Sequence, residues 1–141
     1  EQTVETGEEI CIHDPCSTRF HAEVHQSVRS VTASLGLKLG DMKHQRKRTL
    51  CCGEGGSAGF VAPEITDQWA EQRAEQADGR QVITYCAGCV HFLSGKMTTI
   101  HLVDLMLYPE KVLAGKAPAS RWPFTYLSRL RLKSRLKRLV R

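Results

Sequence analysis

Long apolar runs are absent from this 141-residue chain: none approaches the roughly 18 residues that a membrane-spanning helix needs. The first ten residues, EQTVETGEEI, are acidic and polar and do not resemble a secretory signal peptide. We therefore expect a cytoplasmic protein. The chain begins with Glu1 rather than Met, and we expect it to be an excised domain or a processed fragment of a longer protein.

Acidic residues are absent from the C-terminal end. From Arg121 onward there are eight Lys or Arg and no Asp or Glu, so the net charge of +5 conceals a net charge of −3 over residues 1–120. Leu132, Leu136 and Leu139 recur at helical spacing there, beside a row formed by Arg131, Arg135 and Arg138. The sequence predicts a basic amphipathic helix, which would lie on an anionic membrane, on an acidic partner or on the acidic body. The charge distribution argues against a nucleic-acid-binding body.

Familiar catalytic and nucleotide-binding motifs are absent as well. The glycine-rich stretch TLCCGEGGSAGF, residues 49–60, contains neither a Gly-Lys-Ser/Thr sequence nor the G-x-G-x-x-G pattern. We find no Ser/His/Asp set and no paired carboxylates suited to acid–base catalysis. The cysteines are therefore the residues most suited to carry a chemical function in this chain.

The pattern of apolar residues predicts alternating strands and helices. Strands are expected at residues 9–13, 37–42, 80–86 and 98–101, and helices at 17–36, 63–77, 87–95 and about 102–107, with Pro109 ending the last. Phe20 should face the core with the valines of the first helix, and Ile65, Trp69 and Gln72 should face inward from the second. This alternation predicts an α/β, Rossmann-like layered domain with a mainly parallel sheet of about four strands, plus the C-terminal basic helix.

The predicted organisation is an N-terminal extension at 1–8, a cysteine-rich domain at 9–108, a linker at 109–120 and a basic tail at 121–141. With 41% hydrophobic and 25% charged residues, the chain has the composition of one globular domain. The run KHQRKR at residues 43–48 is expected to be a solvated loop.

Five of the six cysteines follow predicted strands. Cys16, Cys86 and Cys89 lie at strand ends or in the first helical turn beyond, and Cys51 and Cys52 precede the glycine-rich turn. Cys11 lies inside the first strand and is expected to be a small core residue. Because ligands collect at the carboxyl ends of strands in open α/β sheets, we expect one pocket to gather the five thiols. A secreted disulfide framework is the less favoured interpretation, because C-x-x-C and C-C spacings suit metal or redox chemistry in a reducing compartment.

Two metal centres fit this spacing. Zinc would take four ligands: Cys16, one of Cys51 and Cys52, Cys86 and Cys89. Adjacent cysteines grip one small ion poorly, but they can bind neighbouring irons of a cluster, which favours an iron–sulfur site. Backbone N–H groups of Gly53, Gly55 and Gly56 are expected to donate to the sulfurs, and His13 is expected to lie beside the site.

Four stretches together resemble the cysteine-rich CCG domain: HDPC at 13–16, CCGEGG at 51–56, CAGC at 86–89 and IHLVDLM at 100–106. This module occurs in heterodisulfide reductase, in the iron–sulfur subunits of glycolate oxidase and of lactate-utilisation enzymes, and in anaerobic glycerol-3-phosphate dehydrogenase. Here 34 residues separate Cys16 from Cys51, and 32 lie between Gly53 and Cys86, which matches the family spacing. The resemblance covers residues 9–108. Ala87 replaces the usual proline of the last motif, and Ser57 stands where a third glycine is common.

The resemblance implies an iron–sulfur domain that exchanges electrons with a redox partner, either a ferredoxin-like domain or a flavoprotein. It implies a [4Fe–4S] cluster, noncubane in heterodisulfide reductase, with Cys16, Cys51, Cys52, Cys86 and Cys89 as ligands; some copies of the motif bind zinc instead. Family members usually carry two such domains, so we expect this chain to transfer electrons within a larger oxidoreductase rather than turn over substrate alone.

Overall fold

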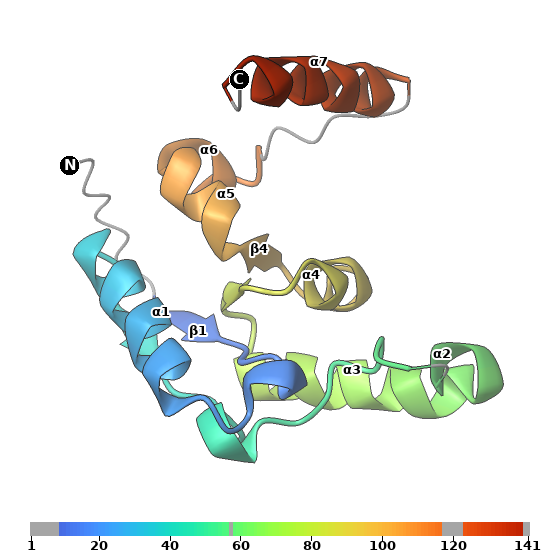
Figure 1. Ribbon diagram of the computed structural model, residues 1–141. Helices are drawn as coiled ribbons and strands as arrows, with labels where there is room; N and C mark the ends of the chain where they lie inside the picture. Colours follow the sequence, from blue (N-terminus) through green and yellow to red (C-terminus); the bar gives the residue numbers. More distant parts are fainter. Residues whose placement is uncertain (1–8, 57, 117–122, 140–141) are drawn as a thin grey trace.

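The computed structural model describes residues 9–56, 58–116 and 123–139. Four short strands, β1 (Ile10–Ile12), β2 (Leu39–Gly40), β3 (Val82–Thr84) and β4 (Thr99–His101), form one sheet. Every neighbouring pair is parallel, and the order is β2-β1-β3-β4 (Figure 1). The predicted α/β class and the four parallel strands are confirmed.

Helices connect the strands and follow the last one. The longer ones are α1 (Ala22–Ser34), α3 (Pro63–Ala77), α4 (Ala87–Leu93) and α7 (Phe124–Leu139). The shorter ones are α2 (Ala58–Val61), α5 (Leu102–Leu107) and α6 (Pro109–Leu113), with two 3-10 turns, η1 (Cys16–Thr18) and η2 (Arg46–Arg48). In the part of the chain that the structure describes, no helix combines the length and apolar character needed to cross a membrane.

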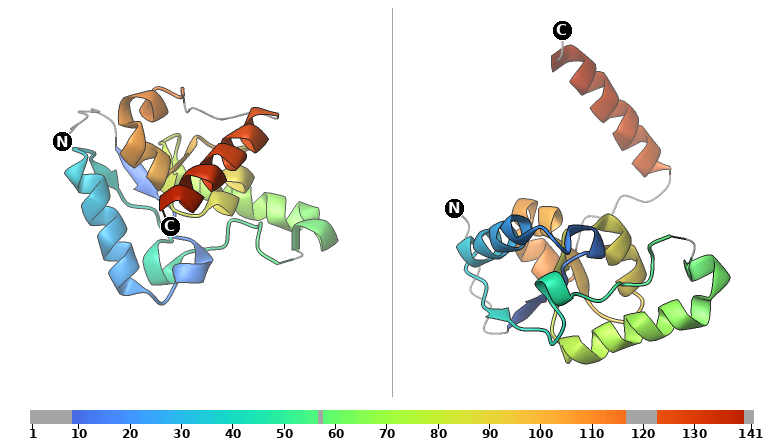
Figure 2. Two further views of the ribbon diagram at one scale, coloured as in Figure 1. Left: turned by 45° about the horizontal axis from the view of Figure 1, so that its top comes forward. Right: turned by 60° about the horizontal axis from the view of Figure 1, so that its bottom comes forward.

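Alternate residues of each strand serve opposite faces of the sheet. Ile10, Ile12, Ile83 and Ile100 share a core with α1, α5 and α6, whereas Cys11 and Val82 pack with Ala77 of α3. Figures 1 and 2 show α1 and α3 on opposite sides of the sheet. Cys11 is 0% exposed, which confirms its prediction as a core residue. The result is a three-layer helix–sheet–helix sandwich.

The sheet has a topological switch point between its two central strands. The chain moves from β1 to β2 in one direction and then crosses to β3 and β4 on the other side. In such folds the crevice outside the carboxyl ends of the two strands at the switch point is where ligands bind. The residues that follow β1 and β3 lead directly to Cys16 and to Cys86.

The start of the first helix differs from its prediction. Residues 16–18 form η1, and α1 begins only at Ala22, so Phe20 lies before the helix and is 78% exposed. The Thr18 hydroxyl donates to the Pro15 carbonyl and lies 2.9 Å from the Tyr85 hydroxyl. The first cysteine loop therefore occupies the turn that the sequence assigns to the helix.

The buried face of α3 is also different from its prediction. Thr66, Ala70, Arg73 and Ala77 are buried, whereas Ile65, Trp69 and Gln72 are exposed. The two rows differ by one residue, a rotation of about 100° around the helix. The small side chains of Ala70 and Ala77 on the inner row let α3 pack closely, Ala77 against the sheet and Ala70 against Cys52 and Cys89.

The stretch predicted as a linker begins with secondary structure. Residues 109–113 form α6, whose Val112 is buried in the core shared by α1 and α5. Pro109 stands at the first turn of α6, where its missing N–H costs nothing, so it starts a helix as well as following one. Residues 1–8, 117–122 and 140–141 lie outside the described residues, and within the predicted tail the described part is α7.

Candidate metal centre

The five predicted ligands sit on three segments that meet at the switch point. Cys16 opens η1 after β1, Cys51 and Cys52 lie on the loop between η2 and α2, Cys86 is the residue before α4, and Cys89 is in its first turn. Cys16 is exposed, Cys51 and Cys86 are half-buried, and Cys52 and Cys89 are each 3% exposed. The site thus runs from solvent into the interior.

The thiols interact with one another across the three segments. The Cys89 Sγ donates to the Cys52 Sγ at 3.3 Å, which joins α4 to the central loop. Cys16 interacts with Cys51, and Cys86 with Cys89. All six cysteines of the chain are free thiols. The structure therefore places the five thiols in one neighbourhood, and the described donor atoms that lie within 4.8 Å of one another are those of Cys52, Cys89 and His13.

The buried pair Cys52 and Cys89 shares one proton. The hydrogen bond from Cys89 is the largest cause that lowers the pKa of Cys52, to about 4, with further contributions from His13 and the Glu54 N–H that outweigh the effect of burial. The same hydrogen bond, together with burial, strongly raises the pKa of Cys89. Burial and the neighbouring Cys51 raise the pKa of Cys16. The hydrogen bond thus favours thiolate at Cys52 and thiol at Cys89, and a metal that takes all the thiols would release protons on binding.

His13 lies directly behind the buried thiols. Its ring is 1% exposed, and a ring nitrogen and the Sγ atoms of Cys52 and Cys89 all lie within 4.8 Å of one another. Neither ring nitrogen makes a hydrogen bond of normal geometry to any described group. The nearest groups to this buried imidazole are therefore the sulfurs, above all that of Cys52, and a ring so placed fits a site that is completed by a metal or cluster.

Of the three predicted glycine donors, only Gly53 acts as one among the described residues. Its N–H donates to the Cys51 Sγ at 3.3 Å. Gly55 and Gly56 are exposed and make no such bond in the described structure, so their role as donors stays a prediction. The chain turns outward after Gly53. A second backbone N–H, that of Glu54, interacts with the Cys52 thiol and lowers its pKa.

Sequence reasoning missed Asp14. This residue is completely buried and forms a two-pronged ion pair with Arg29 of α1. Burial alone would raise the pKa of its carboxyl group, but the hydrogen bonds from Arg29 and from the Arg46 N–H hold it below the ordinary value. The signal available in the sequence was its position two residues before Cys16, in the HDPC stretch.

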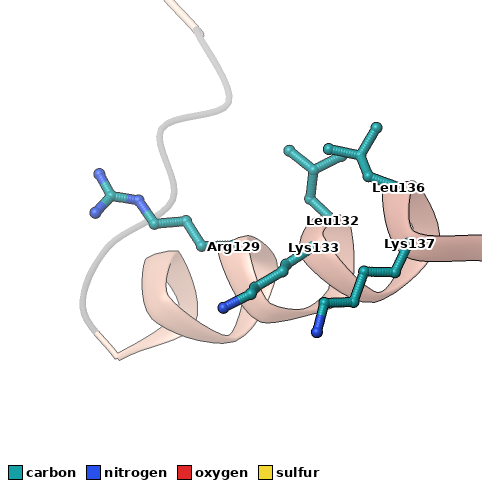
Figure 3. A pocket seen from close by; sticks show the side chains of 5 residues that line it. All are labelled: Arg129, Leu132, Lys133, Leu136 and Lys137. Carbon is teal, nitrogen blue, oxygen red and sulfur yellow. The ribbon is translucent and has the colours of Figure 1, made fainter. Parts of the chain in front are cut away.

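A second concave surface lies on α7, apart from the cysteines. It is lined by Arg129, Leu132, Lys133, Leu136 and Lys137. Figure 3 shows the two leucines on one side of the helix and the three cations beside them. At 100° per residue, Arg131, Arg135 and Arg138 form a second cationic row on the other side of the leucines. The predicted basic helix is present, but Tyr126, Leu127 and Leu130 form another apolar patch, so its polar and apolar residues are not cleanly separated.

Fold and site together define a cysteine-rich α/β domain whose thiols gather at the switch point of a parallel sheet. The chain belongs to the CCG cysteine-rich domain family, which matches residues 10–94.

Two curated relatives carry iron–sulfur names. The chain is 29% identical over 97 residues to a probable membrane-anchored ferredoxin of Chromohalobacter salexigens, covering 63% of this chain and 14% of that protein. It is 28% identical over 88 residues to a probable iron-sulfur-binding oxidoreductase, FadF, of Bacillus subtilis, covering 62% of this chain and 12% of that protein. The match thus spans about one seventh of either relative, and no solved structure matches the chain.

Proposed function

We propose that this chain is an iron–sulfur-cluster-binding electron-transfer domain of a larger oxidoreductase. The observation that carries the proposal is the convergence of five free cysteines, from three segments, at the switch point of the sheet. Thiolate ligands from Cys16, Cys51, Cys52, Cys86 and Cys89 suit a soft, electron-rich metal centre. The iron–sulfur names of both relatives support the choice of cofactor.

The residues around the thiols fit this role. When bound, an iron–sulfur cluster would supply one-electron redox chemistry. The Gly53 and Glu54 N–H groups donate toward Cys51 and Cys52 and so offset negative charge on sulfur. Burial of Cys52 and Cys89 keeps water from the inner side, while exposed Cys16 marks the edge nearest to solvent, where a redox partner would approach.

In finer detail, we propose a heterodisulfide-reductase-like [4Fe–4S] cluster that all five cysteines hold, noncubane because five thiolates exceed the four of an ordinary cluster. The partner would be a ferredoxin-like domain or a flavoprotein. Because the match covers about one seventh of each relative, substrate turnover would belong to the larger assembly.

A second candidate is a structural zinc site, and one observation favours it. His13, Cys52 and Cys89 form a compact buried group of three donors, and Cys86 adjoins Cys89. Three thiolates and one imidazole are a common tetrahedral set for structural zinc. In that site Cys51 would not be a ligand, and the domain would have no redox role.

Anaerobic purification and reconstitution separate the two candidates. We expect a coloured protein with about four irons and four sulfides per chain, as a [4Fe–4S] cluster requires. Cys51→Ala and Cys52→Ala should each lose the cluster, because each removes a ligand. Cys11→Ala is the matched control, since it removes a buried thiol outside the site and should leave the cluster intact. A colourless protein with one zinc, retained in Cys51→Ala, would overturn the iron–sulfur proposal.

We also propose that the basic helix α7 makes peripheral contact with an anionic membrane surface, as part of a cytoplasmic protein. Its described residues include six Lys or Arg and no acid, in two rows beside Leu132, Leu136 and Leu139. One relative is named as membrane-anchored, which supports the same location.

A further inference from the structure

We propose that Asp14 is the positioning residue of the metal centre, because it ties together the three cysteine-bearing segments before metal binds. The inference rests on the proposed function in so far as the five cysteines bind metal, but it does not depend on which metal they bind. Asp14 touches no thiol in the described contacts; it acts through the segments that carry them.

The carboxylate of Asp14 is fixed in orientation by α1. The Nη1 of Arg29 donates to Oδ1 at 2.9 Å, and its Nη2 donates to Oδ2 at 2.8 Å. Arg29 is itself held by the His25 carbonyl at 3.1 Å and by the Gln45 side chain at 3.1 Å. Such a two-pronged pair fixes both the direction and the plane of the carboxylate, and Asp14 stands two residues before Cys16.

The loop that carries Cys51 and Cys52 is attached to Asp14 at two points. The Arg46 N–H donates to Oδ2 at 2.6 Å, and the Thr49 hydroxyl donates to the Asp14 carbonyl at 2.6 Å. The backbone of Arg46 has a φ of 55°, which is a left-handed conformation that non-glycine residues adopt rarely. The hydrogen bond from its N–H to Asp14 helps to hold this conformation. Thr49 is buried and stands two residues before Cys51.

The third segment is attached through Tyr85, the residue before Cys86. Its hydroxyl donates to Asp14 Oδ1 at 3.1 Å and lies 2.9 Å from the Thr18 hydroxyl of η1. One buried carboxylate thus connects the loops of Cys16, of Cys51 and Cys52, and of Cys86.

The hydrogen bonds around Asp14 preorganise the cysteine-bearing segments for metal binding. The cysteine segments are far apart in the chain, so bringing their loops together around a metal costs conformational entropy. A network that holds them in register lowers the ordering cost of metal binding. Partners outside the ligand shell typically contribute 10- to 100-fold to metal affinity.

The test is a Co²⁺ titration of the reduced 141-residue chain under anaerobic conditions, with Thr49→Val compared with Thr32→Val. Both threonines are buried and each substitution removes one hydroxyl group. The Thr49 hydroxyl donates to the Asp14 carbonyl and also lies 3.3 Å from the Leu50 carbonyl, whereas that of Thr32 donates to the Val28 carbonyl within α1, away from the cysteines. We expect Thr49→Val to weaken Co²⁺ binding by about 10- to 100-fold and to reduce the thiolate-to-cobalt charge-transfer absorbance per bound ion. Thr32→Val should bind Co²⁺ as the parent chain does.

Circular dichroism and thermal unfolding of the metal-free variants show whether a loss of affinity is a loss of fold. Tyr85→Phe removes a single hydroxyl and replaces Thr49→Val as the test variant if Thr49→Val does not fold. It should weaken Co²⁺ binding to the same extent. Unchanged affinity in Thr49→Val and Tyr85→Phe, or an equal loss in Thr32→Val, would overturn the proposal. If the chain takes up no iron and sulfide but the variants show the expected differences in Co²⁺ affinity, the iron–sulfur function is wrong and the role of Asp14 is supported.

Discussion

Gly53 occupies a backbone position that other residues cannot share. Its φ is +105°, and an added Cβ would lie 2.8 Å from the Phe92 ring and 2.9 Å from the Thr66 carbonyl oxygen. Gly53→Ala should therefore cost about 1–3 kcal/mol in the free energy of unfolding. It should also weaken metal retention, because the N–H that donates to Cys51 would move. Urea unfolding of the metal-free chain and metal release to a chelator measure the two effects.

The matched control for that substitution is Gly55→Ala. Gly55 is exposed, and nothing lies within 4 Å of its added Cβ. Its free energy of unfolding should change by no more than about 0.5 kcal/mol, as is usual at open surface positions. Equal effects at Gly53 and Gly55 would contradict this account of the turn.

The place of a single residue in the structure was predictable where it follows from its position relative to a strand. The placement of cysteines at strand ends follows from the geometry of parallel sheets, and so does the position of His13 just after β1. The role of Asp14 was not predictable, because its partners come from three separate segments of the chain: Arg29 on α1, Arg46 and Thr49 on one loop, and Tyr85 after β3. Gly53 could not be told apart from Gly55 and Gly56 as a donor, because composition alone does not show where a loop turns outward.

Among the elements, α3 gives the sharpest test of packing. Ala70 is 1% exposed and lies in one cluster with Cys52, Cys89 and Leu93, whereas Ile65 is exposed. Ala70→Leu should cost about 1–3 kcal/mol in the free energy of unfolding, because three added carbons must enter a filled space. Ile65→Ala should cost less, since it removes a partly solvated side chain. Urea unfolding of both metal-free variants measures the order, and a larger loss for Ile65→Ala would mean that α3 packs through its other row.

Element types were easier to predict than element faces and ends. Alternation of short apolar runs with helical stripes identified all four strands of the sheet. The helical stripe of α3 was misassigned by one residue because Ile and Trp were taken as inward, whereas close packing against the thiols favours Ala and Thr. The helix α6 was missed because a proline ends one helix and can begin the next.

For the whole molecule, the remaining question is what the tail binds. Each basic residue near an anionic membrane surface contributes about 1 kcal/mol, so replacing Arg131, Arg135 and Arg138 with Gln should weaken vesicle binding about 100-fold. Co-sedimentation of the full chain with vesicles of neutral lipid alone, or with added phosphatidylserine, measures this. The variant Lys43→Gln, Lys47→Gln, Arg48→Gln is the control, because it removes the same charge from the exposed segment around η2. If net charge alone drove binding, both variants would lose it equally. If the parent chain ignores anionic vesicles, the membrane proposal fails and an acidic protein becomes the better candidate for the tail.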